Sequence, residues 1–134
     1  MMEHVLLRQG MDICLNVLSG GERVKVLHDG GDGVTEVSKK HFTKYIKYFV
    51  PVELTVRKHG YFTFELFGIS KSGEGTLILE SGFNCGYGGE GPHGALWAIE
   101  KLGRVTTQLK RLITSCNLVV IDFRGDEPKV DFHI

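Results

Sequence analysis

Three segments after Pro51 constrain the fold of this chain most strongly, because each has the composition of a β-strand. Residues 52–58, 61–69 and 76–80 are rich in β-branched and aromatic residues, and segments containing glycine separate them. In the second segment Phe64 and Phe67 fall on opposite faces, so both faces carry aromatic side chains. This pattern predicts the central strand of an antiparallel meander.

Two helical patterns and a last pair of strands follow the meander. Residues 92–102 carry apolar side chains at helical spacing, Pro92 suits the first helical position, and Gly103 suits the position after the helix end. Residues 106–116 carry a second apolar stripe, and two helices joined so tightly are expected to be neighbours. The predicted strands that follow are residues 118–123 and 129–134.

A third helix is predicted over residues 38–49, which precede the meander. Ser38 is expected to cap its N-terminus, Val37 and Phe42 to form a hydrophobic staple, and Pro51 to stop it. Its lysines are interpreted as a solvated helix face: Lys39, Lys40, Lys44 and Lys47.

Alternating patterns in residues 12–19 and 22–28, joined by Gly20-Gly21, predict a hairpin near the start of the chain. Together the patterns predict one domain over residues 1–134 with an α+β fold. We expect a mainly antiparallel sheet of about six or seven strands with three helices, of which two consecutive helices pack on one face.

Charge and cysteine content narrow the function classes. Lys and Arg together number 16, as do Asp and Glu, so no net field favours nucleic acid or an anionic membrane. The three cysteines are an odd number without close pairing, which favours a reducing, cytoplasmic setting. The start of the chain lacks a signal-peptide pattern and no apolar run is long enough to span a bilayer, so a soluble protein is expected. We predict no metal site and no cofactor, since the histidines show no zinc-ligand spacing.

The segment GFNCGYGGEGPHG, residues 82–94, is the strongest functional signal. Its glycines lie between a strand pattern and a helix pattern, where bare backbone N–H groups and the helix dipole attract an anion. The spacing does not match a dinucleotide-binding or P-loop motif. Glu90 offers a different interpretation, in which its own carboxylate satisfies the helix N-terminus and the loop is only a connector.

We therefore predict a small-molecule binding module whose ligand carries phosphate or carboxylate, with a nucleotide-like compound as one candidate. Tyr87, Phe83 and Trp97 offer stacking surface, although Trp97 more often belongs to the core at such a position. Arg8, Arg104 and Arg124 are candidate phosphate partners. The predicted ligand-binding residues are Asn84, Gly86, Tyr87, Gly88, Gly89, Gly91 and His93.

Two other function classes remain open. A hydrolase or transferase would use Cys85 as nucleophile near a helix N-terminus, with His93, His133 and Asp131 as candidate catalytic partners. A protein-interaction domain of the inhibitor or immunity type would present the loop as a rigid knob. Apolar strand edges also make a homo-oligomer an expected partner state.

Overall fold

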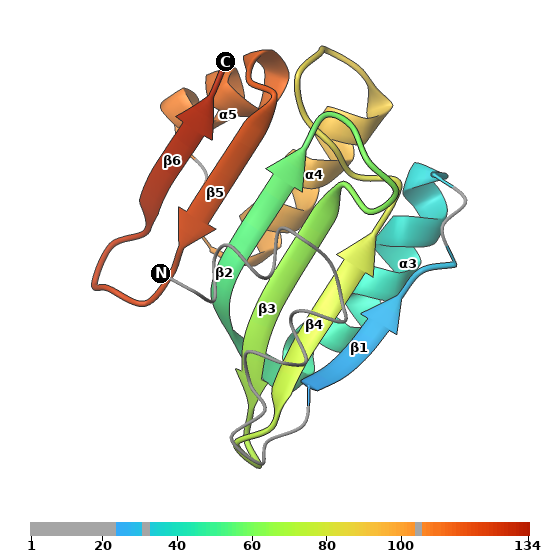
Figure 1. The fold of residues 1–134 in the computed structure, drawn as a ribbon, viewed down its shortest axis with the longest axis vertical. Helices are drawn as coiled ribbons and strands as arrows, with labels where there is room; N and C mark the ends of the chain where they lie inside the picture. The colour runs from blue at the N-terminus through green and yellow to red at the C-terminus, as the bar shows by residue number, and fades with distance from the viewer. Residues whose placement is uncertain (1–23, 31–32, 104–105) are drawn as a thin grey trace.

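The computed structural model describes residues 24–30, 33–103 and 106–134, and within them the elements form a sheet with helices on one face (Figure 1). The strands are β1 (Val24–His28), β2 (Phe49–Arg57), β3 (Phe64–Ser70), β4 (Gly75–Glu80), β5 (Leu118–Asp122) and β6 (Lys129–His133). The helices are α3 (Thr35–Tyr45), the 3-10 turn η1 (Ile46–Tyr48), α4 (Glu90–Lys101) and α5 (Thr107–Ser115).

The sheet has six strands in the order β1-β4-β3-β2-β5-β6. All neighbours are antiparallel except β1 and β4, which are parallel. The meander of β2, β3 and β4 is confirmed, with β3 between the other two, and α4 and α5 contact each other. The predicted α+β fold class is therefore confirmed.

The main core fills the space between the sheet and all three helices. Phe42 of α3 is fully buried and makes edge-to-face contacts with Phe64 of β3 and with Phe83. Ala98 and Ile113 bring α4 and α5 to the same cluster. A second, smaller cluster lies on the other face of the sheet and consists of Val24, Phe67, Leu77 and Leu79. β3 carries apolar residues on both faces because each face contributes to one of these two clusters.

The start of α3 differs from the prediction. The helix begins at Thr35, its N-cap is Val34 without a side-chain cap, and Ser38 lies one turn inside. Val37 therefore lies inside the helix and does not precede its cap, so it is not placed for the expected hydrophobic staple. Ser38 is fully buried because its hydroxyl makes tertiary hydrogen bonds, which capping preferences do not anticipate.

Pro51 also has a role other than the predicted helix stop, because it lies inside β2. A register shift between Pro51 and Glu53 interrupts the pairing with β3, and pairing with β5 begins only at Glu53. A proline fits this position because the strand is irregular there and has a partner on one side only.

The last two helices match their patterns closely. Thr106 caps α5, since its hydroxyl accepts a hydrogen bond from Leu109 N at 3.1 Å. Gly103 follows α4 with φ +105°, as expected of the residue after a helix end. Pro92 is the third residue of α4 rather than the first, where its missing N–H still costs nothing. Of the predicted hairpin, residues 12–19 lie outside the described residues.

Candidate functional site

The glycine-rich segment leaves β4 at Ser81, crosses the end of the sheet and enters α4 at Glu90 (Figure 1). Its first half is anchored to the core, because Phe83 and Cys85 are fully buried. Asn84 N donates to Gly91 O at 3.3 Å, and Gly86 N donates to Ile113 O at 2.7 Å. These two amides point inward and already have partners, so they are not available to a ligand.

A cavity of about 350 Å³ lies beside the second half of the segment. Its walls come from the N-terminal ends of α3 and α4 and from the two residues that follow β4. Sequence reasoning did not anticipate that α3 contributes. The lining residues are Gly33, Val34, Thr35, Ser81, Gly82, Asn84, Tyr87, Glu90 and Gly91.

Unpartnered backbone N–H groups surround this cavity. In the described part of the chain, the N–H groups of Thr35 at the start of α3 and of Glu90 and Gly91 at the start of α4 have no hydrogen-bond acceptor. Neither helix has a side-chain cap. Two helix N-termini therefore present open donors and partial positive charge to one space.

Close approach of the backbone creates the cavity walls, and two glycines permit it. A Cβ on Gly82 would lie 2.6 Å from both Ser38 Oγ and Val34 O, so only glycine lets the β4 end meet α3. A Cβ on Gly91 would lie 2.0 Å from Asn84 Oδ1 and 3.0 Å from the Tyr87 hydroxyl. Asn84 Oδ1 is itself buried without a hydrogen-bond partner, while Asn84 Nδ2 donates to the Tyr87 hydroxyl at 3.2 Å.

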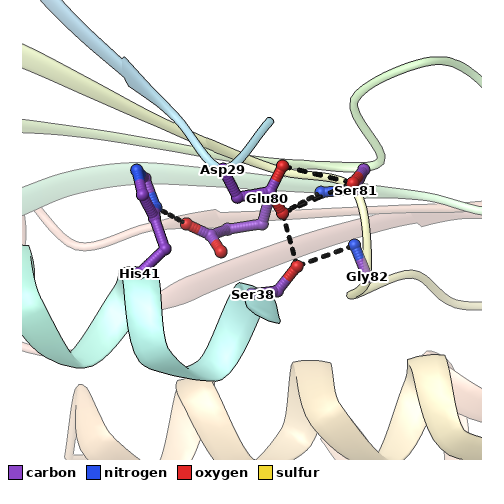
Figure 2. Close-up of polar contacts among 6 residues, drawn as sticks. All are labelled: Asp29, Ser38, His41, Glu80, Ser81 and Gly82. Atoms are coloured by element: carbon purple, nitrogen blue, oxygen red, sulfur yellow. Dashed lines mark hydrogen bonds and ion pairs between the residues drawn. The ribbon is translucent and has the colours of Figure 1, made fainter. Parts of the chain in front are cut away.

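Under the cavity floor, a buried polar network ties α3 to the ends of β1 and β4 (Figure 2). Ser38 Oγ donates to Asp29 Oδ2 at 2.5 Å and accepts from Gly82 N at 2.8 Å. Ser81 N donates to Asp29 Oδ2 at 2.9 Å. The Ser81 hydroxyl in turn accepts from Gly33 N, so Ser81 joins the network to the cavity wall.

Glu80 and His41 form a second pair in this network (Figure 2). Glu80 is fully buried, and its Oε1 contacts His41 Nδ1. Burial and then the nearby Asp29 raise the pKa of Glu80 to about 10, and the Ser38 hydroxyl opposes the shift. Burial also lowers the pKa of His41, against the attraction of Asp29. Both pKa shifts favour the uncharged forms of the carboxyl and the imidazole at neutral pH.

Parallel pairing explains why these residues meet. The register places His28 of β1 beside Leu79 of β4, so Asp29, which follows β1, comes beside Glu80, the last residue of β4. A polar residue at the end of each apolar strand was the available signal. Sequence analysis missed it because nothing in the sequence showed that β1 and β4 are parallel neighbours.

The predicted binding residues divide into two groups. Asn84, Tyr87 and Gly91 line the cavity, and Glu90 lines it as well. His93 is exposed in the first turn of α4, and its N–H donates to Gly89 O. The predicted binding residues that do not line the cavity are Gly86, Gly88, Gly89 and His93.

Of the aromatic and arginine candidates, Phe83, Trp97 and Arg124 do not line the cavity. Phe83 is fully buried, and Trp97 packs against Phe42 with Lys39 and Lys101 over its ring. Arg124 pairs with Asp122 at 3.0 Å. Arg8 and Arg104 lie outside the described residues, and among the described residues that line the cavity there is no lysine or arginine.

Cys85 lacks the surroundings of a nucleophile. Its thiol is fully buried and donates to Val56 O at 3.6 Å. Burial, followed by Cys116, raises the pKa of the thiol to about 12, which disfavours the reactive thiolate. Asp131 and His133 are exposed on β6, and neither they nor His93 hydrogen-bonds to the thiol in the described part of the chain.

Within residues 24–30, 33–103 and 106–134, no group of three or more His, Cys, Asp or Glu side chains is arranged to hold a metal ion. None of the helices in these ranges has the length and apolar character needed to cross a bilayer.

Comparisons with models of protein families, with curated proteins and with solved structures give no significant match. Function must therefore be argued from the site.

Proposed function

We propose that this chain is a small-molecule binding module, and that its ligand places an anionic group in the cavity between the N-termini of α3 and α4. The observation that supports the proposal is the convergence of open N–H groups from both helices on one cavity. An anion there accepts hydrogen bonds from N–H groups that have no acceptor in the described part of the chain, and it interacts favourably with two helix dipoles.

Among anions, the lining favours a carboxylate over a phosphate. A phosphate monoester carries about −1.5 to −2 charges at neutral pH and is usually bound with Arg or Lys. The described residues that line this cavity include no such cation and do include Glu90. A single negative charge is repelled less by that carboxylate.

The remaining polar groups indicate what else the ligand carries. Glu90 and the buried Asn84 Oδ1 are hydrogen-bond acceptors, and Oδ1 has no partner among protein groups. A ligand that also offers N–H or O–H donors would satisfy them. The proposed ligand is thus a small carboxylate with donor groups, with phosphate-bearing nucleotides as the second choice.

A thermal-shift panel of small carboxylates, sugar phosphates and nucleotides tests the proposal. A specific ligand at 100 times its Kd should stabilise the native state by about 2.7 kcal/mol, which raises Tm by several degrees. Gly91→Ala should abolish the shift, because the added Cβ displaces Asn84 and Tyr87. Gly88→Ala is the matched control, since its Cβ meets no atom within 4 Å.

A second test measures the affinity of the Glu90→Gln variant for a simple anion such as acetate. Removal of this charge should tighten acetate binding by up to about fivefold, a change of up to about 1 kcal/mol. If no compound stabilises the wild type, or if Gly91→Ala keeps full binding, the proposal is wrong. The first outcome would favour a protein-interaction domain instead.

A further inference from the structure

The open edge of the sheet at β6 is a second surface, separate from the cavity. In the described part of the chain β6 pairs only with β5, and its residues are mostly exposed. Phe132 is 44% exposed and Ile134 is 91% exposed. The outer N–H and C=O groups of such a strand are available for pairing with another strand.

β6 lacks the features that commonly protect a sheet edge. Its pairing with β5 runs without a register shift, so no bulge twists it away. Its five residues contain no proline, and its single lysine, Lys129, is the first residue. Charged side chains on one face alternate with Val130 and Phe132 on the other.

Two-fold symmetry restricts how β6 can pair with β6 of a second copy. The axis must pass through a residue paired with itself, because opposite residues in an antiparallel pair share a face. An axis at Asp131 sets two like charges together, and an axis at Val130 brings Pro128, which has no N–H, opposite Phe132.

An axis at Phe132 instead makes every pair favourable. Phe132 then faces Phe132, Val130 faces Ile134, and Asp131 faces His133 on the opposite side of the sheet. The strand is therefore complementary to itself on both faces, with apolar pairs on one face and Asp131 opposite a histidine that can donate a hydrogen bond on the other. We propose that this chain forms a homodimer in which two β6 strands pair antiparallel about Phe132 and join both sheets into one.

Sedimentation velocity over about 1–500 µM tests this register, since a small interface predicts a Kd in the micromolar range. Asp131→Lys places a lysine opposite His133 twice, and His133→Glu places a glutamate opposite Asp131 twice. Each single variant should weaken self-association about tenfold. Both positions are exposed, so the fold should be kept.

Mixing the two single variants provides the decisive measurement. In the mixed dimer, the introduced lysine would face the introduced glutamate at one pair, and the native Asp131 and His133 would face each other at the other pair. Association should therefore return to the wild-type level. Lys25→Glu is the matched control, because Lys25 is exposed on β1 at the opposite edge of the sheet and its change should leave the dimer unaltered. A wild type that stays monomeric throughout, or single variants that dimerise as well as the wild type, would overturn the proposal.

Discussion

At the scale of single residues, Glu80 is an acidic side chain in a fully buried position that disfavours its charged form. A carboxyl group that is fully buried beside Asp29 and His41 is stable only when it keeps its proton. The raised pKa favours protonated Glu80 in the native state, whereas the unfolded chain releases the Glu80 proton near pH 4.5. This difference links the stability of the fold to pH.

The pKa shifts of Glu80 and His41 set the direction in which the stability changes with pH. The pKa of Glu80 is raised in the native state, so its contribution is complete below about pH 4.5 and is lost as pH rises toward about 10. The pKa of His41 is lowered, so its contribution is present above about pH 6.5 and is lost at lower pH. Stability should therefore be greatest in the mildly acidic range and fall on the alkaline side.

We predict that Glu80→Gln removes most of the alkaline fall. Urea unfolding of the wild type at pH 6 and pH 9 should show a loss of at least about 1 kcal/mol, because each unit of pKa shift corresponds to about 1.4 kcal/mol. In Glu80→Gln the loss should be smaller by at least half. Glu36→Gln, which removes an exposed carboxylate from α3, should behave like the wild type. Equal pH dependence of Glu80→Gln and the wild type would contradict the buried, protonated carboxyl.

At the scale of elements, side chains of α3 hold this helix against the end of β4 through tertiary hydrogen bonds, and one of them runs from Thr35 Oγ1 to Gly82 O at 2.9 Å. Ser38 Oγ donates to Asp29 and accepts from Gly82 N, and the start of this helix forms one wall of the cavity. The position of α3, and with it the shape of the cavity, therefore depends on these tertiary hydrogen bonds in addition to core packing around Phe42.

We predict that Ser38→Ala destabilises the fold by about 1–3 kcal/mol, since Gly82 N–H is left buried without an acceptor. Chemical denaturation measures this loss. Ser72→Ala provides the comparison, because its hydroxyl bonds only to Ser70 in an exposed turn, and it should cost less than about 0.5 kcal/mol. A cost for Ser38→Ala as small as that for Ser72→Ala would mean that the hydroxyl does not fix α3.

The sequence predicted best the helix ends that depend only on residues close together in the chain. Thr106 and Gly103 mark the ends of α5 and α4 because capping depends on neighbouring residues only. Ser38 was misplaced as a cap because its partners, Asp29 and Gly82, are distant in sequence. The candidate cavity shows the same division: Asn84, Tyr87 and Gly91, predicted from the local glycine pattern, line it, whereas Thr35 and Ser81 come to it through contacts between distant parts of the chain.

In the whole molecule, the cavity and the proposed dimer edge lie toward opposite ends of the sheet. The cavity is at the ends of β1 and β4, and β3, β2 and β5 separate β4 from β6. Because neighbouring strands lie about 4.8 Å apart, the four steps from β4 to β6 span about 19 Å. Energetic effects at sites farther apart than about 10 Å without shared partners usually add.

We therefore predict that ligand binding and self-association are independent. The ligand Kd, measured by calorimetry at protein concentrations well below and well above the dimer Kd, should agree within about twofold, since a coupling of about 0.4 kcal/mol is the limit of additivity. Asp131→Lys should leave the ligand Kd unchanged, and Gly91→Ala should leave the dimer Kd unchanged. Linkage requires that any effect of the ligand on dimerisation equals the effect of dimerisation on the ligand. A larger change in both constants would show that the sheet transmits strain from α3 and β4 to β6, and the two surfaces would then belong to one regulated unit.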